Sequence, residues 1–187
     1  MSRIADELKK RILVLDGAMG TLIQGHRLDE AATRGRFKDH PCPLKGNNDL
    51  LSITQPKIIE DIHRAYLDAG ADILETNTFN SNRISMADYQ MESLVHELNV
   101  SAVHLAKKLT EAYTKKDPSK PRFVAGSMGP TTKLPSLGHV SFKQMSKSYY
   151  VQAKGLVEGG ADLLCVETCQ DLLQTKCRRL LEDVPPL

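Results

Sequence analysis

A carboxylate followed by a glycine-rich turn lies near the start of the chain, where it could bind a small charged ligand. Asp16 ends a run of four hydrophobic residues and is followed by Gly17, Ala18, Met19 and Gly20. Such a run predicts a buried parallel strand with polar chemistry at its carboxyl end. Because glycine tolerates positive φ and close backbone approach, the amides of Gly17, Ala18 and Met19 can converge on an anion. With Asp16 beside them for a cation, the stretch favours a zwitterion such as an amino acid; a tight turn capped by Asp16 is the alternative.

Three later segments have the same form, a short hydrophobic run that ends in polar side chains. They are residues 71–78, with Glu75 and Asn77; residues 122–130, with Ser127; and residues 162–168, with Glu167. In a parallel α/β sheet the site lies beyond the carboxyl ends of the strands, so these side chains should surround one spot together with Asp16. One acidic residue can simply cap a strand end, but several that converge favour a functional site.

Helical segments separate these strands, and the alternation predicts a parallel sheet with crossover helices. The chain also repeats itself: Gly126-Ser-Met-Gly129 resembles the first glycine turn, and Gly160-Ala-Asp162 resembles Gly70-Ala-Asp72. Likeness between alternate strands is a feature of (β/α)8 barrels, whose inward residues layer by odd and even strands. A closed barrel typically needs about 250 residues, so we expect about the first four βα units, a half barrel. A small doubly wound parallel sheet is the alternative fold.

Side-chain alternation along the strands makes a further prediction about the carboxylates. Every second residue of a strand points to the same face. Asp16 should therefore share a face with Ile12 and Val14, and Glu167 should share one with Cys165. Both carboxylates would then stand above the inward layer of a barrel.

Local signals also mark the helices. Thr54 is the expected N-cap of a helix that has Pro56 in its first turn. Ser141 and Gln144 form a capping box for a later helix. A final helix is expected from Asp171, and its apolar face would consist of Leu173, Cys177 and Leu180.

Composition narrows the class of protein. The chain is 41% hydrophobic and 26% charged, with a formal net charge of +2, which is too near neutral to favour nucleic acid as a partner. It contains neither a run of roughly 20 apolar residues for a membrane span nor a signal-peptide core. The cytoplasm is therefore the expected location.

Cysteines and histidines give weaker signals. None of the four cysteines, Cys42, Cys165, Cys169 and Cys177, forms a CxxC pair, so they are expected to be free thiols, mostly in the core, and to bind no metal. Three histidines in helical patterns, His63, His96 and His104, are expected to be exposed or partly buried.

Several of these motifs together resemble the homocysteine S-methyltransferase family. They are Leu15-Asp-Gly-Ala-Met-Gly-Thr21, Gly46-Asn-Asn-Asp-Leu-Leu51, Thr54-Gln-Pro56, Gly70-Ala-Asp-Ile-Leu-Glu-Thr-Asn-Thr-Phe79 and Gly126-Ser-Met-Gly-Pro130. The second and the last point to the N-terminal module of cobalamin-dependent methionine synthase. The resemblance extends from about Arg11 to Lys176.

The resemblance implies a (β/α)8 barrel that binds homocysteine at the strand ends. The homocysteine carboxylate would lie on the amides of Gly17, Ala18 and Met19, and its amine between Asp16 and Glu167, with Glu75, Asn77 and Ser127 as secondary contacts. In the family, a zinc ion held by three cysteines binds the homocysteine sulfur and keeps it as the nucleophilic thiolate. The methyl group would come from methylcobalamin, recharged from methyltetrahydrofolate on other modules.

The chain departs from the family pattern at the metal. The zinc-binding cysteines lie in the second half of the barrel, and no cysteine of this chain matches one. Residues 1–187 are thus expected to be a partial homocysteine-binding barrel domain, truncated before the zinc ligands and inactive alone. The rest of the barrel and the cobalamin and folate modules would be its partners.

Two other functions stay open. The first is a zinc-dependent homocysteine methyltransferase that uses betaine or S-methylmethionine. The second is a non-catalytic protein that binds an amino acid or docks onto a partner through unpaired strand edges, which can also cause aggregation.

Overall fold

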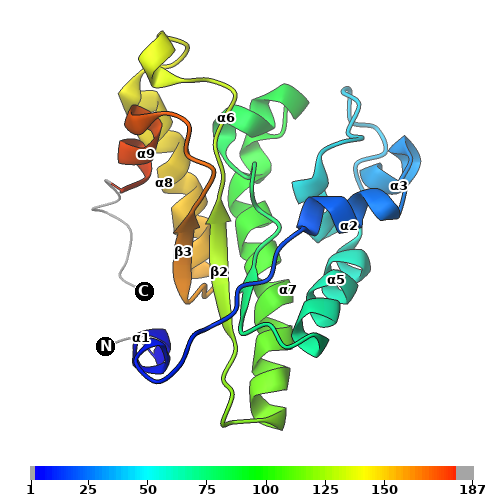
Figure 1. Cartoon of the computed structure of the whole chain (residues 1–187). Helices are drawn as coiled ribbons and strands as arrows, with labels where there is room; N and C mark the ends of the chain where they lie inside the picture. Colours follow the sequence, from blue (N-terminus) through cyan, green and yellow to red (C-terminus); the bar gives the residue numbers. More distant parts are fainter. Residues whose placement is uncertain (1–2, 180–187) are drawn as a thin grey trace.

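The computed structural model describes residues 3–179 and has a parallel sheet at its centre (Figure 1). Its strands are β1 (Ile73–Glu75), β2 (Phe123–Met128) and β3 (Leu163–Val166), in the spatial order β1-β2-β3. Three long helices, α5 (Pro56–Asp68), α7 (Val95–Lys116) and α8 (Phe142–Glu158), connect or precede them. The shorter elements are α1 (Arg3–Leu8), α2 (Met19–Gly25), α3 (Glu30–Arg34), η1 (Asn48–Leu50), α4 (Leu51–Thr54), α6 (Arg83–Met86), η2 (Ala87–Tyr89), η3 (Glu92–Leu94), η4 (Pro135–Leu137) and α9 (Leu172–Arg179).

The long helices all pack on one face of the sheet. The main core joins Leu74 and Val124 of the sheet to Leu67 of α5, Val103 of α7 and Leu156 of α8. Strand neighbours follow chain order, with no reversal of the winding. A doubly wound sheet has helices on both faces and a reversal of strand order, so this alternative is wrong. The arrangement is that of part of a (β/α)8 barrel.

The opposite face corresponds to the inside of a barrel. A second apolar cluster covers it, formed by Ile73, Phe123 and Ala125 with partly buried Leu163 and Cys165. Ile4 of α1 belongs to the same cluster, and Figure 1 shows α1 beside the amino-terminal ends of the strands. Helix α1 therefore closes one end of this inner face.

The first predicted strand, residues 12–15, does not form as expected. It makes one isolated parallel bridge to β1, Leu15 to Ile73, and Val14 O accepts the N–H groups of Asp72 and Ile73 at 2.8 and 3.1 Å. The prediction of burial is wrong, because Ile12 is 89% and Val14 55% exposed. A strand buried on both sides needs two neighbours, and among residues 3–179 this segment pairs only with β1.

The predicted face of Asp16 is also wrong, whereas that of Cys165 is confirmed. Leu15 is in register with Ile73, and Leu13 packs with the inner cluster, so these two residues and not Ile12 or Val14 take the inner face. Asp16 falls on the opposite side by alternation. Cys165 lies in the inner cluster, as the alternation predicted.

The repeated Gly-Ala-Asp sequence is a structural repeat. Oδ2 of Asp72 accepts the N–H of Val14 at 3.0 Å, and Oδ2 of Asp162 accepts the N–H of Val124 at 2.7 Å. Each aspartate in turn donates its own N–H to the carbonyl of the same valine at 2.8 Å. The glycine two residues earlier has a φ of +103° in the first copy and +92° in the second. Val14 and Val124 are therefore equivalent positions in two similar units.

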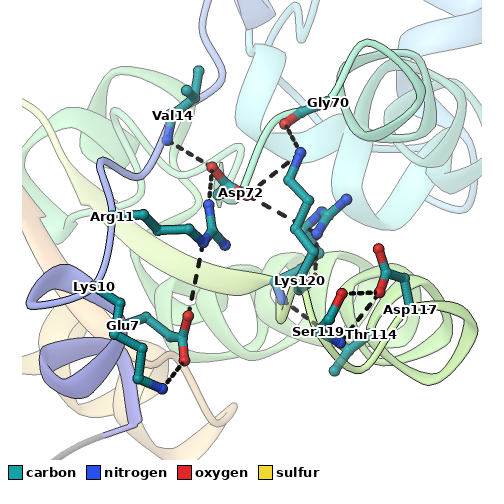
Figure 2. A network of polar contacts seen from close by, with 11 residues as sticks. Glu7, Lys10, Arg11, Val14, Gly70, Asp72, Thr114, Asp117, Ser119 and Lys120 are labelled. Atoms are coloured by element: carbon teal, nitrogen blue, oxygen red, sulfur yellow. Dashed lines mark hydrogen bonds and ion pairs between the residues drawn. The ribbon is translucent and has the colours of Figure 1, made fainter.

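Asp72 also lies at the centre of a cluster of basic residues at this end of the sheet (Figure 2). Arg11 contacts it at 2.9 Å, Lys120 at 3.7 Å and Arg122 at 3.9 Å. Burial alone would raise the pKa of Asp72, but the hydrogen bonds from Arg11 and Val14 and the charges of Arg11 and Lys120 lower it overall. The ionised carboxylate thus ties the first segment to β1.

Of the two predicted helix caps, one is confirmed and one is wrong. The capping box of Ser141 and Gln144 is confirmed at α8, whereas the cap of α5 is Gln55 and not Thr54. In α9, Cys177 is buried as predicted but Leu173 is exposed, and Leu180 lies outside the described residues. No helix within residues 3–179 is long and apolar enough to cross a membrane.

Candidate functional site

A cavity of about 350 Å³ opens at the carboxyl ends of the strands, and all eight residues proposed from the sequence line it. These are Asp16, Gly17, Ala18, Met19, Glu75, Asn77, Ser127 and Glu167. Six further lining residues were not proposed: Gly20, Asn48, Asp49, Thr76, Phe79 and Asn80. The volume is in the range of small-molecule sites. Convergence at one cavity agrees with the sequence analysis; the role of each residue in binding stays a prediction.

The glycine turn leaves its amide groups available to the cavity. No acceptor within the described chain takes the N–H of Gly17, Ala18 or Met19. The residue with positive φ is Ala18, at +47°, and not Gly17 or Gly20 as expected. A Cβ built on either glycine would meet nothing within 4 Å. The glycines therefore keep space open in front of the amides, while Ala18 turns the backbone.

Asp16 anchors the turn from behind. Its Oδ1 accepts the N–H of Glu75 at 2.8 Å, and its Oδ2 lies 3.9 Å from Nδ1 of His63. The side chain is only 3% exposed. Asp16 thus joins the end of the first segment to the tip of β1, and its charge acts on the cavity from below the surface.

Glu75 lies on the inner face beside Cys165. Burial raises the pKa of Glu75, and the charges of Glu167 and Asp16 add to the rise, while a hydrogen bond with Cys165 opposes it. Burial and the contact with Glu75 raise the pKa of the Cys165 thiol to about 12. The sulfur at this position is therefore a protonated thiol at neutral pH.

Glu167 is oriented by Ser127. The Ser127 hydroxyl donates to Oε1 of Glu167 at 2.5 Å. The Ser127 N–H in turn donates to the hydroxyl of Thr76 at 3.0 Å, which fixes the serine at the end of β2. Glu75 and Glu167 lie on the same face of the sheet. Glu75 pairs with Ala125 of β2, and Cys165, two residues before Glu167, pairs with Ser127, two residues after Ala125.

Asn77 holds a loop that forms another wall of the cavity. Its amide nitrogen donates to the carbonyl of Asn48 at 2.8 Å and to the hydroxyl of Ser52 at 3.3 Å. These bonds connect the end of β1 to the segment around η1. The amide nitrogen of Asn77 is thus used within the protein.

Asp49 is the one ionisable residue among the six lining residues that were not proposed. It is buried in the cavity wall and accepts the N–H of Asn80 and the hydroxyl of Ser81, both at 2.8 Å. Burial raises its pKa to about 6 against these hydrogen bonds. Asp49 belongs to the Gly46–Leu51 motif that resembles the family, so an acidic residue within that motif was a signal that could have identified it.

The cavity has the electrostatics expected for an amino acid. Four carboxylates line it, from Asp16, Asp49, Glu75 and Glu167, and no lysine or arginine of the described chain does so. These carboxylates favour a cationic group, whereas the unpartnered amides of the glycine turn favour an anionic one. A small zwitterion satisfies both.

The described residues do not fit a zinc site. Residues 3–179 contain no group of three or more His, Cys, Asp or Glu side chains able to hold a metal ion. The high pKa of Cys165 is the opposite of what a thiolate ligand needs. The expectation that most cysteines are core residues is wrong, since Cys177 is buried but Cys42 and Cys165 are partly exposed and Cys169 is exposed.

The prediction of exposure or partial burial fails at His63 and holds at His96 and His104. His63 is fully buried, although it was expected to be exposed or partly buried. His96 and His104 are exposed. His139, in the loop after β2, is exposed and does not line the cavity.

Comparison with known proteins identifies the class to which this fold and site belong. The model of the homocysteine S-methyltransferase family matches residues 13–185, so the chain belongs to that family. Similar solved structures are those of the homocysteine methyltransferase MmuM from Escherichia coli. The metallated form aligns with a TM-score of 0.75 at 23% identity and the oxidized form with 0.74 at 24%. The apo form aligns with 0.65 at 26%.

These alignments include nearly the whole of this chain but only part of the MmuM chain. The alignments include 94–95% of this chain and 57–61% of the MmuM chain. The fold prediction of a partial barrel is confirmed by this match and by the parallel sheet. The shared fold places the cavity at the carboxyl ends of the strands, where barrel enzymes have their active sites.

Proposed function

We propose that this chain forms the homocysteine-binding part of a homocysteine S-methyltransferase. The observation that carries the proposal is the meeting of the Gly17–Met19 amides with Asp16, Glu75 and Glu167 at one cavity. Family membership supports homocysteine as the amino acid. Residues 1–187 would act as one partial barrel domain.

In the proposed complex, the two charged ends of homocysteine bind at opposite sides of the cavity. Its carboxylate accepts hydrogen bonds from the amides of Gly17, Ala18 and Met19. Its ammonium group lies against Glu167, which Ser127 orients, within the field of the buried Asp16. Glu75 lies deeper, beside Cys165.

Methyl transfer needs more than these residues supply. A free thiol has a pKa of about 8.5, so most of it is protonated at neutral pH. The family resemblance implies zinc for this activation, but the described residues offer no metal site. We therefore propose that the chain alone binds homocysteine without methylating it, and that the rest of the barrel is a required partner.

The methyl donor has two candidates. The motifs around residues 46–51 and 126–130 support a methionine synthase module, which would take the methyl group from methylcobalamin supplied by other modules. Betaine or S-methylmethionine is the alternative donor, and it stays open because the similar solved structures are of a homocysteine methyltransferase, MmuM, and not of a methionine synthase. The proposed homocysteine site is common to both.

Calorimetric titration of the chain tests the binding proposal. L-Homocysteine should bind, whereas N-acetylhomocysteine, which lacks the ammonium group, should bind at least about tenfold more weakly because one charge-assisted contact is lost. Gly17→Ala should weaken binding by a similar factor, since its methyl group enters the open space before the amides. It should leave the free energy of unfolding within about 1 kcal/mol of the wild type.

Gly25→Ala is the matched control. Gly25 also has open space around a built Cβ, but it does not line the cavity. It should bind homocysteine like the wild type. Equal affinity for homocysteine and its N-acetyl derivative would contradict the proposal. Dimerisation without ligand binding, measured by light scattering, would favour a docking protein.

A further inference from the structure

His63 is a buried polar side chain directly behind the cavity. Helix α5 places it among apolar neighbours, including Ile59 and Ile62, and it has no exposed surface. Neither ring nitrogen has a hydrogen-bond partner among residues 3–179. Because a buried polar group without a partner costs free energy, a histidine in such a place needs an explanation.

A charged group, Asp16, lies beside this ring. Nδ1 of His63 lies 3.9 Å from Oδ2 of Asp16, and both side chains are almost completely buried. The other oxygen of Asp16 accepts the N–H of Glu75 at 2.8 Å, and the Asp16 N–H donates to the carbonyl of Ile73 at 3.0 Å. A group that fixes Asp16 therefore fixes the start of the Gly17 turn and the tip of β1 together.

The second unit of the chain shows that the fold does not need this polar pair. Since Val14 and Val124 are equivalent, Gly126 takes the position of Asp16. A Cβ on Gly126 would lie 2.9 Å from the side chain of Leu156, so α8 packs an apolar residue directly on the strand there. The Asp16–His63 contact occurs only in the unit whose strand end carries the amide turn.

We propose that His63 is a positioning residue of the cavity, whose Nδ1–H holds Oδ2 of Asp16 from behind and so keeps the Gly17–Met19 amides aligned with Glu75. The role in ligand binding rests on the proposed function. A separation of 3.9 Å is too long for a direct hydrogen bond. Contacts of this kind are often long without substrate and tighten in the complex, so homocysteine should shorten it.

Amide hydrogen exchange of the 187-residue chain tests the role directly. The Glu75 N–H reports on Asp16, and the Ile73 N–H, bonded to Val14 O, is a reference in the same strand. His63→Leu should lower protection at Glu75 about tenfold while Ile73 changes little, and should weaken homocysteine binding about tenfold. His63→Asn, which keeps a donor near the Nδ1 position, should restore both to within about threefold. Added homocysteine should raise protection at Glu75 in the wild type.

His104→Leu is the matched control, because His104 is exposed on α7; it should change neither amide. Unchanged protection at Glu75 in His63→Leu would overturn the proposal. Equal losses at Glu75 and Ile73 would do the same, since they would indicate only a structural role. If Glu75 loses protection selectively but the wild type binds no homocysteine, the proposed function is overturned and the positioning of Asp16 by His63 is supported.

Discussion

At the scale of single residues, the cavity contains a carboxylate that burial makes unstable in its charged form. Asp49 has a pKa raised to about 6 by burial, against the hydrogen bonds from Ser81 and Asn80. The folded protein then binds this proton more tightly than the unfolded chain, whose aspartates titrate at about 3.9. Stability from this group is therefore present at low pH and lost as the pH rises from about 4 to about 6.

We expect Asp49→Asn to be more stable than the wild type at pH 7, by on the order of 1–3 kcal/mol. The amide oxygen can accept from the same two donors without carrying a charge. The difference should shrink towards pH 4, where Asp49 is protonated. Urea unfolding of both proteins at pH 4 and pH 7 measures the difference in their free energies of unfolding at each pH. Asp88→Asn, at an exposed position in the same region, should stay within about 0.5 kcal/mol of the wild type, and a less stable Asp49→Asn at pH 7 would contradict the pKa argument.

His63 shows what residue patterns could not predict. Helical spacing indicates which face of a helix is buried, but not whether a polar side chain on that face has a partner. His63 lies on the buried face of α5 with Ile59 and Ile62. Its significance depends on Asp16, which is distant in the sequence. The strand-end carboxylates were predictable, because the carboxyl ends of parallel strands meet at one edge of a sheet.

At the scale of elements, one of the two local repeats predicted more than hydrophobic runs did. The likeness of Gly126-Ser-Met-Gly129 to the first glycine turn does not hold, because residues 126–128 belong to strand β2. The Gly-Ala-Asp repeat is confirmed by the same pair of hydrogen bonds in both copies, since it encodes a helix end and a strand start within a few residues. The segment at residues 12–15 is as hydrophobic as β3 yet forms one bridge, because pairing depends on its neighbours. The polar stretch after α2 is likewise held by side-chain contacts that composition does not reveal: Arg34 donates to the carbonyls of His40 and Cys42.

The two copies of the aspartate should differ in their contribution to stability. Asp72→Asn would leave Arg11, Lys120 and Arg122 without their shared anion, and we expect a loss of about 2–3 kcal/mol. Asp162→Asn removes one contact, to Lys107, from a more exposed site and should cost about 1 kcal/mol.

The pH dependence separates charge from packing. The pKa of Asp72 is lowered in the folded state, so its stabilisation is present above its ordinary value of about 3.9 and is lost as the pH falls through the lower folded value. The gap between wild type and Asp72→Asn, measured by urea unfolding, should therefore narrow from pH 7 to pH 3. A gap independent of pH would show that the loss comes from packing.

At the scale of the whole molecule, the chain has an inner face and a cavity but an uncovered edge. It spans about 60% of the length of MmuM in the best alignments. Ile12, Val14 and Leu15 are 89%, 55% and 43% exposed on a segment whose backbone pairs on one side with β1. Exposed apolar residues on an unpaired edge favour pairing with another chain.

We expect the chain to associate with itself as its concentration rises, through this edge. Ile12→Lys combined with Val14→Glu should suppress association, because charged residues on an edge strand oppose strand pairing between chains. Light scattering and sedimentation across a concentration series measure the mass. Leu137→Lys, at another exposed apolar residue but in the loop after β2, should associate like the wild type. Two outcomes would contradict this prediction: a wild-type chain that stays monomeric at every concentration, or a Leu137→Lys control that suppresses association equally. Either would show that the chains do not associate through the uncovered edge. The rest of a barrel would then be needed to complete the site and not to prevent self-association.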